Sequence, residues 1–327
     1  MALILREADV RRILTMADCL TWLEEAFRAY AAGRARNLPR RRVRWPEGML
    51  HTLPAADLTV DAVGLKTYAS VRGTTRFLVV LFSASSGELL ALIEADYLGA
   101  VRTGAASGVA TRYLAREDAR RVGMIGTGNQ ARTQLAAVAA VRPIERAVVW
   151  SRDPARRERF CREMAADLGL PVEPAASAEA AVREQDIVIT ITTARQPVLH
   201  GEWLSPGTHI NAAGSNSLLR QEIDDATIRR VDRLVVDSRA QAPLEAGDLQ
   251  GAVERGLLDW DQLPELADLV AGRLPGRQSP TEITLFESLG LGLEDITVAK
   301  RVYERARAAG IGEEVALFTE VQPRQPR

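Results

Sequence analysis

The chain has 327 residues, 46% of them hydrophobic and 26% charged, and its 42 basic and 43 acidic side chains leave a formal net charge of −1. That composition favours a globular protein of two domains, and the charge balance argues against nucleic acid or a membrane surface as a partner. The two cysteines lack metal-ligand spacing, and no apolar run has the form of a membrane span or a signal peptide. We therefore expect a cytoplasmic protein without a metal site.

The first 115 residues predict a small α+β domain. Apolar residues recur at helical spacing between residues 8 and 32, where Asp18 and Thr21 are the candidate caps of the second of two helices. Short apolar segments bounded by Pro or Gly predict strands at 43–45, 49–53 and 63–66, followed by a hairpin of 77–82 and 88–93. A helix rich in small residues is expected from about residue 95 to residue 115, and such residues permit close approach of another backbone or a ligand.

From residue 119 onward, strands and helices alternate, which is typical of a parallel sheet covered on both faces. Strands are predicted at 122–125, 146–150, 187–190, 209–211 and 234–236, and helices at 130–141 and 155–168. The expected fold class is α/β, with a doubly wound, Rossmann-type parallel-sheet domain over residues 116–293 beside the smaller domain. A last helix has no strand after it, so segment 294–327 is expected to return to the first domain. Its polar end, from Gln322, is expected to fray.

A glycine-rich loop directly follows the strand at 122–125 and opens a helix. It reads Gly126-Thr127-Gly128-Asn129-Gln130-Ala131, a GxGxxA pattern. The first glycine makes a tight turn, the second lets the backbone approach a pyrophosphate, and the small last residue packs the helix on the strand. Strand, loop, helix and second strand occur in the required order. We therefore predict that the loop binds a dinucleotide, rather than being only a structural turn.

The end of the second strand indicates which dinucleotide binds. An NAD-binding chain usually carries Asp or Glu there, whereas this chain has Ser151 and Arg152, which can donate to a phosphate. Arg156, in the next helix, adds a positive charge, while Arg157 is expected on the solvated face. Asp153, which precedes a proline, suits a helix cap. The predicted cofactor is NADP(H), preferred over NAD(H).

Cationic side chains of the first domain are candidates for binding a substrate carboxylate. Six arginines lie between residues 34 and 44, and one small site cannot use all of them, so most are expected on a solvated edge. Lys66 ends an apolar strand, where a surface lysine is unexpected, and Arg102 lies on the small-residue helix. Both residues are therefore candidates for the cleft between the domains.

The three histidines differ in context. His51 lies on a strand that leads toward the proposed site, where it is a candidate proton donor, although a structural role is the stronger expectation. His209 is expected in the core of the sheet, and His200 in a surface loop. The HExxH, GxSxG and GxxxxGK[ST] motifs are absent, so metalloprotease, serine hydrolase and P-loop chemistry have no support.

Six ordered motifs resemble those of the ornithine cyclodeaminase/mu-crystallin family. They are MLHTLPA (49–55), GLK (64–66), LGAVRTGAAS (98–107), IGTGNQA (125–131), HINAAGSN (209–216) and ITLFESLG (283–290). The resemblance covers nearly the whole chain. It leaves the reaction open, because the family includes ornithine cyclodeaminases, alanine dehydrogenases, cyclic ketimine reductases and a lens protein that binds NADPH.

The resemblance implies a homodimer formed through the N-terminal domain, which also binds the substrate opposite the nicotinamide. It implies that an arginine near Arg40 grips the substrate carboxylate together with Lys66 and Arg102. Arg40 fits best by its distance to the MLHTLPA motif, and the neighbouring alternatives are Arg41, Arg42 and Arg44. Ser288 resembles a family position near the nicotinamide.

Asn216 is the departure that bears on the reaction. In the cyclodeaminases an aspartate at this position exchanges protons with the amine nitrogens, and the related alanine dehydrogenases also have it; an amide cannot replace it. The ketimine-reducing branch lacks this aspartate and uses NADPH with a Ser-Arg or Asn-Arg pair like Ser151-Arg152. We therefore expect NADPH-dependent reduction of cyclic imino acids, with Lys66 as carboxylate ligand and candidate proton donor. His51 and Asn216 are candidate substrate contacts.

Three alternatives remain beside the reductase. The first is an ornithine cyclodeaminase, a lyase that eliminates ammonia with no net change of its cofactor. The second is an oxidoreductase like alanine dehydrogenase, acting on an open-chain amino acid. The third is a non-catalytic NADPH-binding protein of the crystallin kind. Asn216 and Ser151-Arg152 argue against the lyase, whereas only an assay separates an enzyme from a binder.

Overall fold

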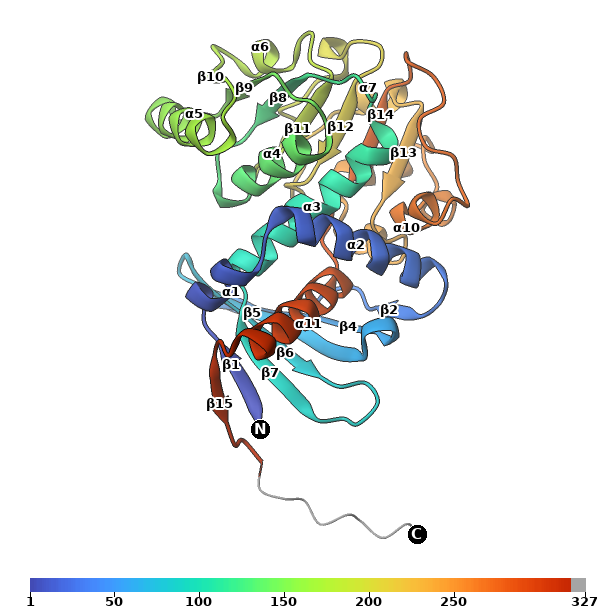
Figure 1. Ribbon diagram of the computed structural model, residues 1–327. Coiled ribbons are helices and arrows are strands. Elements are labelled where there is room, and N and C mark those ends of the chain that lie inside the picture. Colours follow the sequence, from blue (N-terminus) through green and yellow to red (C-terminus); the bar gives the residue numbers. More distant parts are fainter. Residues whose placement is uncertain (319–327) are drawn as a thin grey trace.

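The computed structural model describes residues 1–318, whose strands form two sheets (Figure 1). The strands of the first sheet are β1 (Ala2–Leu5), β2 (Ala35–Asn37), β3 (Arg41–Trp45), β4 (Gly48–Asp57), β5 (Ala62–Val71), β6 (Thr74–Phe82), β7 (Leu89–Glu94) and β15 (Glu313–Val315). Their order is β15-β1-β7-β6-β5-β4-β2, with β3 paired to β4. Strands β4 to β7 form an antiparallel meander that contains the predicted hairpin.

The second sheet is entirely parallel. Its strands are β8 (Arg121–Ile125), β9 (Arg146–Trp150), β10 (Val172–Pro174), β11 (Ile187–Thr190), β12 (His209–Ala212), β13 (Arg233–Val236) and β14 (Thr284–Glu287), in the order β10-β9-β8-β11-β12-β14-β13. The chain runs outward from β8 to β10 and then returns to β11 on the other side of β8. This reversal makes a topological switch point, the place where doubly wound sheets bind ligands. The predicted α/β fold class is confirmed.

The helices cover both sheets and fill the space between them (Figure 1). They are α1 (Glu7–Ile13), α2 (Met16–Ala31), α3 (Asp96–Leu114), α4 (Asn129–Val141), α5 (Pro154–Leu168), α6 (Ala178–Val182), α7 (Asp225–Arg230), α8 (Ala242–Glu245), α9 (Gly247–Glu254), α10 (Leu266–Val270) and α11 (Gly292–Ala309). In the described part of the chain, none of them combines the length and the apolar character needed to cross a bilayer.

Helix capping corrects one prediction and agrees with another. Thr15, with extended backbone, caps α2 by accepting a hydrogen bond from the backbone N–H of Asp18. The two residues predicted as caps therefore lie inside the helix, because it begins one turn earlier than the apolar periodicity suggested. Asp153 caps α5 by accepting from the backbone N–H of Arg156, as predicted.

Helix α3 connects the two sheets by close packing. A Cβ added to Gly104 would lie 2.3 Å from the carbonyl oxygen of Thr133 on α4, so the small residue is what permits this contact. The last helix, α11, packs across β4 and β5 of the first sheet, where the returning segment was expected. Its expected continuation through residues 319–327, including the polar tail, lies outside the described residues.

The predicted domain boundaries, after residue 115 and before residue 294, stay predictions. The apolar core does not divide at those points, because one cluster joins Leu5 and Val79 of the first sheet to Phe286 of the second. Helices α3 and α11 both contribute side chains to this cluster. The packing therefore holds the first sheet, the returning helix and one edge of the second sheet together.

Candidate active site

The glycine-rich loop has the geometry that its sequence requires. Gly126 has φ +121°, and a Cβ there would lie 2.3 Å from the carbonyl oxygen of Ile191, so only glycine makes this turn without strain. A Cβ on Gly128, by contrast, would meet no other atom within 4 Å. Ala131 is fully buried in the core against β8. The loop thus leaves open space beside its backbone at the N-terminus of α4, which suits a pyrophosphate.

A cavity of about 980 Å³ lies at the switch point of the parallel sheet. It lies among the glycine-rich loop, the end of β9 and the loops that follow β11 and β12. Its lining includes Gly126, Thr127, Gly128, Asn129, Gln130, Ser151, Arg152, Arg156, Asn216 and Arg220. Most of the residues predicted to hold the dinucleotide therefore face one cavity.

Arg157 corrects the prediction made for the end of β9. Its Nη1 donates a hydrogen bond to the carbonyl oxygen of Ser151 at 2.8 Å, so it is a half-buried structural residue rather than part of a solvated face. The reason is that α5 turns position 157 back toward the strand end. The Ser151 hydroxyl accepts a hydrogen bond from Thr127 Oγ1 at 3.0 Å, which ties the strand end to the glycine-rich loop. Arg152 and Arg156 are exposed.

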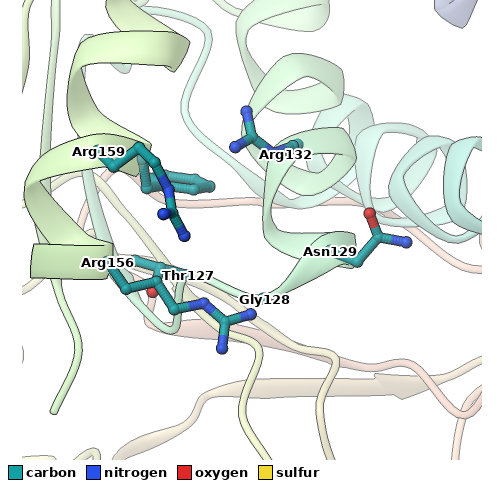
Figure 2. A pocket seen from close by; sticks show the side chains of 7 residues that line it. Thr127, Gly128, Asn129, Arg132, Arg156 and Arg159 are labelled. Atoms are coloured by element: carbon teal, nitrogen blue, oxygen red, sulfur yellow. The ribbon is translucent and has the colours of Figure 1, made fainter. Parts of the chain in front are cut away.

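A second, smaller cavity of about 210 Å³ lies between α4 and α5 (Figure 2). It is lined by Thr127, Gly128, Asn129, Arg132, Arg156, Arg159 and Phe160. Sequence reasoning missed Arg132 and Arg159. Their spacing was the available signal, because Arg159 lies three residues after Arg156 and Arg132 lies three residues after Asn129, one helical turn in each case.

Lys66 occupies a position that the sheet otherwise fills with apolar side chains. Cross-strand pairing places it in one row with Leu5, Ile93, Val79 and Leu53, all buried. The Lys66 side chain is itself only 4% exposed. Such a position is costly for an ammonium group, so this lysine needs a partner or a ligand.

The partner of Lys66 comes from α11. Lys66 Nζ donates to Asp295 Oδ1 at 3.0 Å, and Arg102 Nε donates to the same oxygen at 3.0 Å. Arg102 Nη1 also donates to Glu294 Oε2 at 2.5 Å. Burial and the nearby Arg102 lower the pKa of Lys66 from 10.5 to about 8, although Asp295 opposes them. Asp295 and Glu294 outweigh burial and raise the pKa of Arg102, which keeps it charged.

Arg40 is the arginine of the basic segment that is fully buried in this region. Its Nη2 donates to the carbonyl oxygens of Leu289 and Gly290 at 2.8 and 3.2 Å, and its Nη1 lies 3.4 Å from Glu245 Oε2. Arg42 approaches the other oxygen of Glu245 at 2.5 Å. Arg41 and Arg44 are exposed, so burial favours Arg40 among the alternatives left open by the sequence.

Contacts connect these cations to the large cavity, although they do not line it. Asn216 lines the cavity, and its carbonyl oxygen accepts a hydrogen bond from Arg42 Nη2 at 2.9 Å. Arg40 and Arg42 share Glu245. A Cβ on Gly290, whose carbonyl Arg40 holds, would lie 2.7 Å from Nη1 of Arg102. The predicted substrate residues therefore form one contiguous group beside the large cavity.

The acidic partners were missed by sequence reasoning. They are Glu245, Glu294 and Asp295, and none of them was a predicted site residue. Burial raises the pKa of Glu294, and Arg102 opposes this shift. The sequence offered one signal for Glu294 and Asp295, because they are two adjacent acids at the N-terminal end of a helix whose other core positions are mostly apolar.

The histidines lie largely as expected. His51 stacks on Tyr68 with ring centroids 4.1 Å apart, and burial together with Arg42 lowers the pKa of His51 from 6.5 to about 4. It is therefore neutral near pH 7. His209 is fully buried and hydrogen-bonds Thr284 Oγ1 at 2.9 Å, in agreement with a core role. His200 is half-buried and hydrogen-bonds Asp224.

Two further predicted residues differ in their access to the cavity. The Asn216 side chain accepts a hydrogen bond through Oδ1 from Arg220 Nη1 at 3.2 Å. Ser288 is buried behind the sheet end, where its backbone N–H donates to the carbonyl oxygen of Ala212 at 2.8 Å. Ser288 lines neither of the two cavities.

Comparison with known proteins shows which family the chain resembles over its length. The profile of the ornithine cyclodeaminase/mu-crystallin family matches residues 1–310. A Delta(1)-pyrroline-2-carboxylate reductase of Bacillus cereus is 35% identical, over 96% of this chain and 99% of its own length. Among solved structures, the Thermococcus litoralis Delta(1)-pyrroline-2-carboxylate reductase, in complex with NADH and L-proline, has a TM-score of 0.92 at 37% identity. That match covers 96% of this chain and 100% of that one.

An archaeal alanine dehydrogenase dimer with bound NAD is similarly close in structure. Its TM-score is 0.91 at 34% identity, covering 97% of this chain and 99% of that chain. Relatives with different reactions thus share the whole fold, as the motifs indicated. The extent of these matches confirms the resemblance, and the chain belongs to the ornithine cyclodeaminase/mu-crystallin family.

Proposed function

We propose that this protein is an NADPH-dependent reductase of cyclic imino acids of the pyrroline-2-carboxylate or piperideine-2-carboxylate type. One observation carries this proposal, the buried cationic group beside the cofactor cavity. Four cations, Arg40, Arg42, Lys66 and Arg102, face three carboxyl groups, those of Glu245, Glu294 and Asp295. Burial and the nearby Glu294 raise the pKa of the neighbouring Asp237 to about 8, so this carboxyl is protonated at neutral pH. One positive charge is therefore left over, and a substrate with a single carboxylate would balance it.

The same group has hydrogen-bond donors to spare. Within residues 1–318, Nε of Arg40 is buried and donates no hydrogen bond, and Nη1 has the 3.4 Å contact with Glu245 Oε2 but no hydrogen bond. Lys66 Nζ donates one hydrogen bond, to Asp295, out of the three that an ammonium group offers. Buried donors of this kind are costly unless a ligand accepts from them. A carboxylate, with its two acceptor oxygens, fits that need.

In the proposed reaction, side chains of this protein bind the substrate, orient its imine and protonate the imine nitrogen. Arg40 and Arg102 hold the carboxylate and thereby fix the plane of the imine, which is a large share of catalysis when two reactants must align. Lys66, with a pKa of about 8, is protonated at neutral pH and is the candidate proton donor to the imine nitrogen. The nicotinamide, when bound, supplies the hydride that the imine carbon accepts.

Asn216 argues against elimination of ammonia. Its Oδ1 accepts from Arg220, so the amide is oriented by a cation. An amide exchanges no proton with a substrate amine at neutral pH, whereas a lyase needs a group that does. Arg220 beside it also makes the site a poor host for a second, protonated amine such as that of ornithine.

We propose NADP(H) as the preferred cofactor because of the charge at the end of β9. No carboxylate follows the strand directly; Ser151 and the exposed Arg152 do, and Asp153 is engaged as the cap of α5. Arg156 adds a second guanidinium to the same cavity. A ribose phosphate would find donors there, and a ribose without phosphate would lack its usual carboxylate partner.

We also propose that the protein is a homodimer formed through the first sheet. On the face opposite α11, cross-strand pairs align five half-buried apolar side chains in one row: Ile4, Leu92, Val80, Leu65 and Pro54. No helix of the described residues covers this row. A contiguous apolar strip on a sheet face is typical of a subunit interface.

We assign the protein to the cytoplasm on the state of its thiols. Cys19 and Cys161 are both free and buried, and burial raises the pKa of each. Unpaired thiols of this kind fit a reducing compartment. Fractionation of the source cells, followed by detection with an antibody against the chain, would test this assignment.

The function is tested by the loss of NADPH absorbance with a panel of substrates. Cyclic imino acids of both ring sizes would be run beside ornithine, alanine, and pyruvate with ammonia. We expect saturable oxidation of NADPH with at least one cyclic imino acid and much weaker use of NADH. Release of ammonia from ornithine without net NADPH oxidation would instead identify a cyclodeaminase, and tight NADPH binding without turnover of any substrate would identify a binding protein.

A further inference from the structure

The smaller cavity between α4 and α5 is a side branch of the cofactor cavity. Both cavities are lined by Thr127, Gly128, Asn129 and Arg156. Figure 2 shows Arg156 and Arg159 extending from α5 toward the glycine-rich loop, with Arg132 on α4 opposite them. A group bound at the loop would therefore lie within reach of both helices.

The charges around this branch are unequal. Arg132 forms an ion pair with Glu163, and its guanidinium lies 5.5 Å from the centroid of the Phe160 ring, so it is both neutralised and held in place. Arg156 and Arg159 form no ion pair within residues 1–318, whereas the exposed arginines Arg120 and Arg146 each pair with a glutamate. Two unpaired cations one helical turn apart repel each other unless an anion lies between them.

The position of the branch indicates which anion would bind between Arg156 and Arg159. In a dinucleotide-binding fold, the end of the second strand recognises the adenosine ribose. Here that end is Ser151, whose hydroxyl accepts from Thr127 Oγ1, and Thr127 lines the branch. A phosphate carried by that ribose would thus be beside the branch, while the pyrophosphate is bound at the N-terminus of α4.

We infer that this branch is the subsite for the phosphate monoester on the adenosine ribose of NADPH, and that Arg159 is a specificity-determining residue for it. This inference rests on the proposed function for its dinucleotide. Arg156 and Arg159 provide the charge-assisted hydrogen bonds, and the Arg132–Glu163 pair fixes the opposite wall. Discrimination between the two nicotinamide cofactors then depends on α5 as well as on Ser151 and Arg152.

The test compares Arg159→Ala with Arg162→Ala. Arg162 is an exposed arginine on the same helix that does not line either cavity, so both variants lose one charge from α5. Calorimetry on the full chain would give the affinities for adenosine 2′,5′-bisphosphate and AMP, and then for NADPH and NADH. We expect Arg159→Ala to weaken the bisphosphate and NADPH by about tenfold, with AMP and NADH within about twofold. Arg162→Ala should change none of the four.

Three results would overturn the inference. The first is an equal loss of NADPH and NADH affinity in Arg159→Ala, and the second is no loss of either. The third is Arg159-dependent binding of inorganic phosphate without any preference for the bisphosphate over AMP, which would make the branch a site for free phosphate. A failure of the proposed function would appear in a different experiment, as the absence of imine reduction by the wild-type protein. The binding comparison uses no imine, so its outcome is independent of that experiment.

Discussion

Lys66 Nζ donates a hydrogen bond to Asp295 Oδ1 at 3.0 Å, where strand β5 contacts the returning helix α11. The two residues are 229 positions apart in the chain. Because Arg102 donates to the same carboxylate oxygen, Asp295 holds two of the proposed substrate ligands in one arrangement. The returning helix therefore positions the candidate site in addition to completing the core of the first domain.

Replacing Lys66 should show whether its role is to bind the carboxylate by its charge or to donate a proton to the imine. The lowered pKa of Lys66, about 8, means that the side chain is protonated below about pH 8 and neutral above it. If it is the proton donor, kcat/KM for imine reduction should fall as the pH rises through about 8. Lys66→Met should lower kcat/KM by about 10²- to 10⁴-fold, as removal of a general acid does. Initial rates of NADPH oxidation between about pH 6 and pH 10 would measure both effects.

Lys66→Arg is the matched control, because it keeps the positive charge but releases no proton in this range. A donor role predicts that the arginine variant binds the imine but turns over slowly. Retention of nearly wild-type kcat by Lys66→Arg would mean that Lys66 acts only as a carboxylate ligand. NADPH affinity should stay unchanged in both variants, because Lys66 does not line the cavity proposed to bind the cofactor.

Replacing Asp295 should move the pH dependence. The carboxylate of Asp295 raises the pKa of Lys66 against burial and Arg102, so Asp295→Asn should lower that pKa further. The alkaline fall in kcat/KM should then shift to lower pH by about one unit. Glu294→Gln is the control, because Glu294 contacts Arg102 rather than Lys66. If both variants shifted the profile equally, a specific effect of Asp295 on Lys66 would be excluded; thermal melts of both would report whether each is folded.

The sequence predicted those structural elements and residues whose positions depend on a local pattern of residues. Periodicity predicted the strands of the meander and five of the seven parallel strands, and GxGxxA predicted the turn at Gly126. Lys66 was recognised as anomalous because it interrupts an apolar strand. Even so, its partner lies on α11, and no local pattern pairs residues so far apart. The short strands β1, β2, β10, β14 and β15 were missed because three or four residues show too little alternation.

The side chains around β9 show the same limit. Arg156, Arg157 and Arg159 are close in sequence, yet the first and third line a cavity while the second holds the carbonyl of Ser151. Which face of α5 turns toward the strand depends on where the helix begins, and Asp153 and Pro154 set that start. The sequence therefore placed Arg157 on the solvated face and gave Arg159 no role.

His51 should have no part in proton transfer near neutral pH. The positive charges of Arg42 and Arg40, added to burial, lower the pKa of His51 to about 4, so the ring is neutral throughout the working range. His51→Gln should therefore leave the shape of the pH profile between about pH 6 and pH 9 unchanged. The substitution is expected to raise KM modestly, through the loss of the stack on Tyr68. Disappearance of an acidic limb near about pH 6.5 in the variant would contradict this assignment.

A charge placed in the apolar row of the first sheet should break the proposed dimer. Val80 is paired with Leu65 and Leu92, at the centre of the row, so Val80→Glu would bury an unpaired carboxylate in each half of a symmetric interface. Association should weaken by at least about a hundredfold, which sedimentation at micromolar protein would show as a shift toward monomer. Thr74→Glu adds the same charge at an exposed position of the same strand and should leave the dimer intact. A wild-type chain that sediments as a monomer, or a Val80→Glu chain that remains dimeric, would mean that this face is not the interface.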